Sequence, residues 1–142
     1  MLAMKAYPKE YVDACKARVA ANLKAYRKQV GTTPTKDFEA RYFADQVLLL
    51  DHMFVHRMST LEGKDGNPLN EVRVLCNSLL YNDGKVQVEA LLGWPNSART
   101  GLKMSPETSV LRSKPGDPVR IDEAGFVRLS KAFFAELEKK FT

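Results

Sequence analysis

The chain contains two histidines, and both lie in one apolar segment, residues 45–58, with the sequence DQVLLLDHMFVHRM. If this segment is helical, His52 and His56 lie one turn apart on the same face, because an α-helix repeats every 3.6 residues. Two imidazoles at this spacing can direct ring nitrogens to a common point, as they do in helical metal sites. Asp45 shares that face but lies about 10 Å earlier along the axis. It therefore suits a hydrogen-bond acceptor that orients His52, not a ligand of the same ion.

The pattern predicts a site for a divalent metal (zinc, iron or nickel, which imidazole ligands suit) or for a small ligand at His52 and His56. The zinc-protease motif HExxH is absent, because Met53 follows His52. The Glu-x-x-His pattern of di-iron bundles is also absent, because Leu49 and Met53 occupy the required positions. Two alternatives stay open: histidines that border a packed face and bind water, carbonyl groups or Asp45, and a metal-free role in acid–base chemistry, ligand binding or a pH-sensitive contact. We expect both imidazoles to face neighbouring secondary structure, not bulk solvent.

The spacing of apolar residues predicts an all-α protein with four helices, over about residues 8–30, 36–61, 68–80 and 123–141. Thr35, Asn67 and Asp122 are the expected N-caps, and Pro68 suits a first helical position. The second helix is apolar on nearly every side, so it is either central to the domain or shared with a second subunit. Its short connection to the third helix predicts antiparallel packing of these two. The expected architecture is one domain, an antiparallel four-helix bundle.

Residues 85–121 show no sustained periodicity. The stretch KVQVEALL begins with the alternation of a short β-strand, and residues 93–121 then contain four prolines and three glycines. A long irregular segment inside a small domain is often functional. We expect it to lie across the bundle, with Trp94 and Leu111 as apolar anchors.

Composition limits the possible classes of partner. The net charge is +5, but the 22 Lys and Arg residues are spread among 17 acidic residues, with the densest basic cluster at residues 24–29. No apolar run is long enough for a membrane span or a secretory signal, and two cysteines without CxxC spacing favour the cytoplasm.

Three hypotheses about function follow from these patterns. The first is a helical bundle that binds a metal or small ligand at the histidine pair. The second is a non-enzymatic, homo-oligomeric interaction module that uses the second helix or residues 85–121. The third, less favoured, is a basic protein that binds nucleic acid. No GxSxG elbow or phosphate-binding loop is present, and no motif decides whether the protein is an enzyme.

Overall fold

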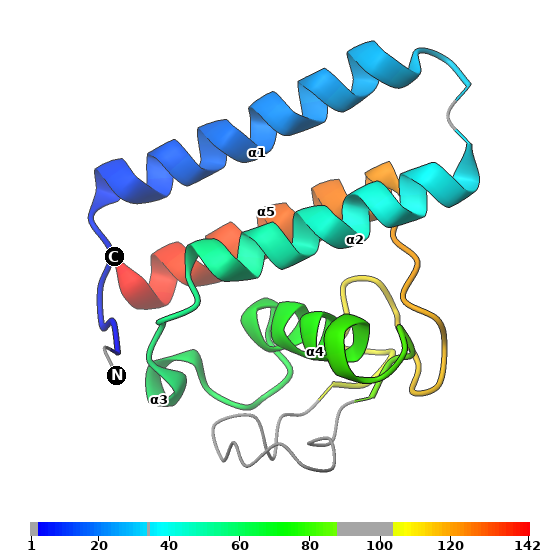
Figure 1. Ribbon diagram of the computed structural model, residues 1–142. Helices are drawn as coiled ribbons and strands as arrows, with labels where there is room; N and C mark the ends of the chain where they lie inside the picture. Colours follow the sequence, from blue (N-terminus) through cyan, green and yellow to red (C-terminus); the bar gives the residue numbers. More distant parts are fainter. Residues whose placement is uncertain (1–2, 34, 88–103) are drawn as a thin grey trace.

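The architecture is all-α, as the sequence predicts, and three long helices run lengthwise beside one another while a fourth crosses them (Figure 1). The computed structural model describes residues 3–33, 35–87 and 104–142. Its five helices are α1 (Lys9–Val30), α2 (Lys36–Met53), α3 (Ser59–Glu62), α4 (Pro68–Tyr81) and α5 (Glu123–Phe141). Helix α1 runs opposite to α2, whereas α2 and α5 run in the same direction, and α4 crosses both (Figure 1). The expected antiparallel packing of α2 against α4 is therefore wrong.

The predicted helix starts are confirmed by their capping geometry. The Thr35 side chain accepts a hydrogen bond from the backbone N–H of Phe38, and Asp122 accepts one from Gly125. Asn67 accepts from the N–H groups of the second and third residues of α4, and Pro68 occupies the first. Each cap satisfies backbone donors that have no partner within the helix.

Helix α2 is central, which explains why its sequence is apolar on nearly every side. Phe43, Val47 and Leu50 are completely buried. Helices α1, α4 and α5 all pack against α2. Helix α2 is therefore central to the domain, although Phe38 in its first turn is exposed.

Helix α2 ends at Met53 and not near Leu61 as predicted, so His56 lies outside it. Residues 54–58 form a linker to α3 that contains neither glycine nor proline. Hydrogen bonds from the N-terminal segment and within the linker hold it in a non-helical conformation. The backbone of Met4 donates to the carbonyl of His56 (2.7 Å) and accepts from the N–H of Met58 (2.9 Å), while Arg57 Nη1 donates to the carbonyl of Phe54 (3.1 Å).

A buried carboxylate connects this linker to α3 and α4. Glu62 is 1% exposed and accepts hydrogen bonds from Arg57 Nε (2.7 Å), Arg73 Nη2 (2.6 Å) and Asn70 Nδ2 (2.7 Å). Burial acts to raise the pKa of Glu62. The hydrogen bond from Arg73 and the charges of both arginines outweigh burial, so the pKa lies below its ordinary value of 4.5. The carboxylate is thus ionised and fully paired inside the protein.

The described part of the irregular segment, residues 85–87 and 104–121, packs against α4. Glu71, completely buried, accepts hydrogen bonds from the Ser109 hydroxyl (2.8 Å) and from the backbone N–H groups of Val110 (2.7 Å) and Leu111 (3.1 Å). Leu111 packs against the core as expected, whereas Trp94 lies outside the described residues. Of the expected short strand, the described residues contain only an isolated antiparallel bridge between Lys85 and Pro118.

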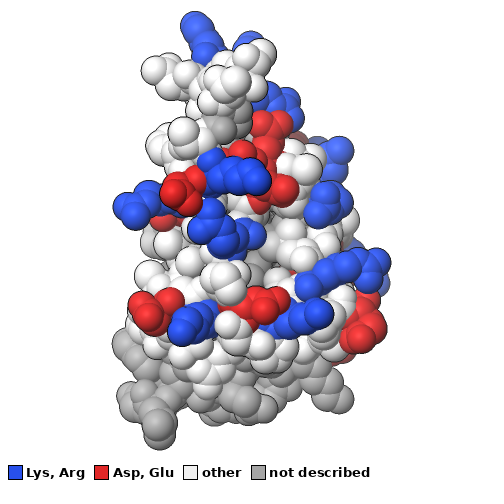
Figure 2. Space-filling model, turned by 90° about the vertical axis from the view of Figure 1, so that its right-hand side faces the viewer, with Lys and Arg blue, Asp and Glu red and all other residues white. Residues whose placement is uncertain are grey.

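The surface mixes charges of both signs. Figure 2 views the end of the molecule that carries the α1–α2 connection, and lysine and arginine side chains alternate there with acidic ones. Two ion pairs account for part of this: Arg27 with Glu123 (2.8 Å) and Arg120 with Asp37 (3.1 Å). Among the described helices, none is sufficiently long and apolar to cross a lipid bilayer.

Replacing Glu62 tests the role of this buried carboxylate. In Glu62→Gln, Arg57 and Arg73 lose their shared counter-charge, and we expect the free energy of unfolding to fall by about 3–5 kcal/mol. Because the pKa of Glu62 is lowered in the fold, its contribution is complete above pH 4.5 and is lost as the pH falls through the folded pKa. Urea unfolding at several pH values should therefore show a weaker acid dependence in the variant.

The matched control is Glu138→Gln, which removes an exposed ion pair with Lys16 on α1. Such pairs contribute roughly 0–1 kcal/mol. Equal losses in the two variants would contradict a special role for Glu62.

Candidate functional site

The structure brings the two predicted histidines to one pocket, although not on one helix. His52 lies in the last turn of α2, and His56 lies in the linker that follows. Both contribute to a pocket of about 380 Å³, here called the histidine pocket, which is lined by Met4, Tyr7, Pro8, Tyr11, His52, Met53, Val55 and His56. Both imidazoles are exposed. The expectation that they face inward is thus wrong: α2 ends before His56, and His52 in its last turn is also exposed.

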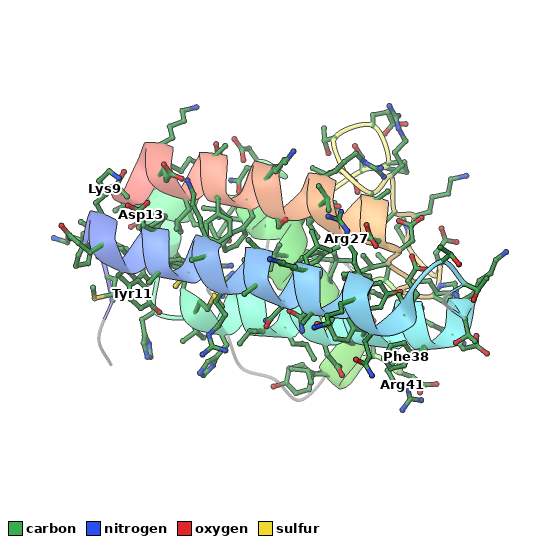
Figure 3. All side chains as sticks on the ribbon, turned by 90° about the horizontal axis from the view of Figure 1, so that it is seen from above. Lys9, Tyr11, Asp13, Arg27, Phe38 and Arg41 are labelled. Atoms are coloured by element: carbon green, nitrogen blue, oxygen red, sulfur yellow. The ribbon has the colours of Figure 1, made fainter. Side chains whose placement is uncertain are left out.

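The N-terminal segment and the start of α1 form the other wall of the pocket. The Met4 backbone forms hydrogen bonds with His56 and Met58, the two neighbours of Arg57 in the sequence. The N–H of Tyr7 donates to the carbonyl of Phe141 (2.6 Å). The Tyr11 hydroxyl donates to the carbonyl of Met53 (2.5 Å) and so joins α1 to the end of α2. Figure 3 shows Tyr11 on the side of α1 that faces α2, with Lys9 and Asp13 on the other side.

Tyr7 connects the pocket with the core. It is 8% exposed, and its ring meets Phe54 edge-on (centroids 5.0 Å apart) and stacks on Tyr11 (5.9 Å). Its hydroxyl is buried and has no hydrogen-bond partner among the described residues. Burial raises the pKa of Tyr7 to about 12, although the positive charge of Arg57 acts in the opposite direction. The phenol is therefore neutral at physiological pH.

The imidazoles are the polar side chains that the pocket offers to a ligand. Its lining contains no acidic residue, lysine or arginine. The Tyr7 hydroxyl is buried, and the Tyr11 hydroxyl is already bonded to Met53. The four ring nitrogens can accept or donate hydrogen bonds, or coordinate a metal, from within mostly apolar walls.

Asp45 does not join this site. It is exposed and is not among the lining residues, so the structure does not place it as an acceptor for His52. Nor does any other acidic or cysteine side chain complete the pair: in the described part of the chain, no group of three or more His, Cys, Asp and Glu residues is placed to hold a metal ion.

Sequence reasoning missed the contribution of the N-terminal segment. Met4, Tyr7 and Tyr11 lie more than 40 residues before the histidines, and their spacing gives no sign of a common site. The available signal was the sequence MKAYPKEY, in which Met4, Tyr7 and Tyr11 recur every three or four residues up to the first turn of α1. Such residues need a surface to cover, and here that surface is the end of α2 and its linker.

Comparison with known proteins gives no match: no family model fits this sequence, and no curated protein or solved structure is significantly similar to it.

The unpartnered hydroxyl of Tyr7 makes a prediction about stability. Tyr7→Phe removes a buried polar group that makes no hydrogen bond, so we expect the free energy of unfolding to stay equal or to rise. Above pH 10 the unfolded chain ionises Tyr7 first, and the wild type loses stability between pH 10 and about 12. Chemical unfolding at alkaline pH should show a smaller loss in the variant.

Tyr42→Phe is the matched control. The Tyr42 hydroxyl donates to the carbonyl of Asn22 (3.1 Å), so its removal should lower the stability by about 1 kcal/mol at neutral pH. A loss of that size in Tyr7→Phe as well would show that the Tyr7 hydroxyl does have a partner.

Proposed function

We propose that this protein binds a metal ion or a small ligand in the histidine pocket. The observation that carries the proposal is that both imidazoles of the chain line the same pocket although they come from different structural elements. A volume of about 380 Å³ lies within the usual range of small-molecule sites. Mostly apolar walls with a few convergent polar groups are also typical of such sites.

Zinc, iron and nickel remain the divalent candidates if the ligand is a metal. Two imidazole nitrogens leave at least two positions of a four-coordinate ion for water or for a bound molecule. An open coordination position is what a metal needs in order to act on a substrate. A ligand without metal would place its apolar part against Met4, Tyr11 and Val55 and its polar part at the imidazoles.

The test compares His52→Ala plus His56→Ala with the wild type. Protein prepared without a histidine tag should bind Zn²⁺ or Ni²⁺ with a stoichiometry near one, as measured by calorimetry and metal analysis. The double variant should lose at least tenfold in affinity, because it lacks both imidazoles. It should stay folded, because each imidazole is exposed and contributes little to the fold.

Asp45→Asn is the control, because Asp45 lies on the same helix but outside the pocket. Its affinity should equal that of the wild type. If the wild type binds no metal ion and no member of a small-molecule library, or if the double variant binds as well as the wild type, the proposal is wrong.

Self-association is the second candidate function, and a groove between α1 and α5 favours it. This groove has a volume of about 500 Å³, and its lining includes Val19, Ala20, Leu23, Val127, Phe134 and Ala135. Lys16, Lys131 and Glu138 add charges of both signs to it. A surface that carries both signs can be complementary to itself across a two-fold axis.

Light scattering tests this second candidate. We expect a dimer in the wild type and a monomer in Ala20→Glu, which places a charge in the groove at an exposed position. Ala17→Glu, exposed on the same helix but outside the groove, should leave the dimer intact. A monomeric wild type at high concentration would exclude this candidate.

The remaining hypotheses have weaker support. Cys15 and Cys76 are buried and form no disulfide, which suits a reducing compartment, and we propose the cytoplasm. Nucleic-acid binding needs a basic surface, and the end of the molecule in Figure 2 mixes both signs instead.

A further inference from the structure

Two methionines lie in the same pocket as the two histidines. Met4 comes from the N-terminal segment and Met53 is the last residue of α2, and both line the histidine pocket. Both are partly exposed, so solvent and dissolved ions reach these side chains. The pocket therefore offers two thioether sulfurs together with two imidazoles.

We propose that the histidine pocket is a site for monovalent copper, coordinated by His52, His56, Met4 and Met53. This inference rests on the proposed function and names its ligand. Thioether sulfur is a soft donor that selects Cu⁺, and imidazole also binds copper well. Zinc and magnesium sites, in contrast, depend on thiolate, imidazole or oxygen ligands, and thioether adds little to them.

The charge of the pocket supports a monovalent ion. All four proposed donors are neutral, and no acidic residue lines the pocket to compensate a metal charge. The cost of moving an ion away from water grows with the square of its charge, so it is about four times larger for a divalent than for a monovalent ion of the same size. A neutral, mostly apolar site therefore favours Cu⁺ over divalent ions.

Two hydrogen-bonded contacts keep the donors together. The Met4 backbone is bonded to His56 and Met58, which ties the sulfur-bearing segment to the linker that carries the second imidazole. The Tyr11 hydroxyl is bonded to the carbonyl of Met53, which fixes the end of α2 beside α1. Methionine is flexible at three torsions, so its sulfur can adjust to an ion without movement of the backbone.

The experiment is a titration with Cu⁺ under anaerobic, reducing conditions, in competition with a chromogenic Cu⁺ chelator. The wild type should take up one equivalent, and X-ray absorption should show sulfur and nitrogen neighbours. Met4→Leu plus Met53→Leu keeps the side-chain volume but removes the sulfurs. We expect it to bind Cu⁺ at least tenfold more weakly, with unchanged affinity for Zn²⁺ or Ni²⁺.

Met58→Leu is the matched control, because Met58 packs against the core as Met4 and Met53 do but does not line the pocket. Its Cu⁺ affinity should equal that of the wild type, and circular dichroism checks that all variants are folded. If the double methionine variant binds Cu⁺ as tightly as the wild type, the thioethers are not ligands. If the wild type binds Zn²⁺, Ni²⁺ or an organic ligand but not Cu⁺, this inference fails while the proposed function stands; if it binds none of them, both fail.

Discussion

The paired burial of Glu62 with Arg57 and Arg73 is the constraint on which the rest of the structure depends. An isolated carboxylate or guanidinium at this depth would cost several kcal/mol, because its charge would leave water without gaining a partner. The three side chains must therefore meet, and they come from the linker, from α3 and from α4. Their meeting holds the linker in place, and the backbone of Met58 also anchors α3 by accepting from the N–H of Glu62 (3.0 Å). Lys140 near the end of α5 donates to the Glu62 carbonyl (2.8 Å) and extends the same junction to the last helix.

This junction also builds the histidine pocket. Arg57 is turned inward to Glu62, and its neighbour His56 is therefore exposed. The parallel bridge between Met4 and Arg57 places the N-terminal segment beside this linker. Charges in the interior thus determine which groups the surface offers to a ligand. The arginine guanidinium lies near the Phe133 ring (5.6 Å from the centroid), so the aromatic core and the ion cluster form one packed unit behind the pocket.

The sequence was sufficient where local signals determine the structure. Three of the four predicted helices match α1, α4 and α5 within a residue or so, because apolar spacing and the caps at Asn67 and Asp122 are local. The end of α2 was not predictable in this way, since no glycine or proline marks it and the contacts that stop the helix come from Met4 and Glu62. The histidine pair was found, but on the assumption that both residues lie on one helix, whereas only His52 does.

The measurement that tests the central claim most directly is an NMR titration that follows the ring signals of the two histidines, the only imidazoles in the chain. Cu⁺ and Zn²⁺ are both diamagnetic, so both rings stay observable while each ion is added. If His52 and His56 form one site, both ring signals shift with the same midpoint and saturate at one equivalent of at least one of these ions. Different midpoints for the two rings, or no response of either ring to either ion, would contradict a shared site.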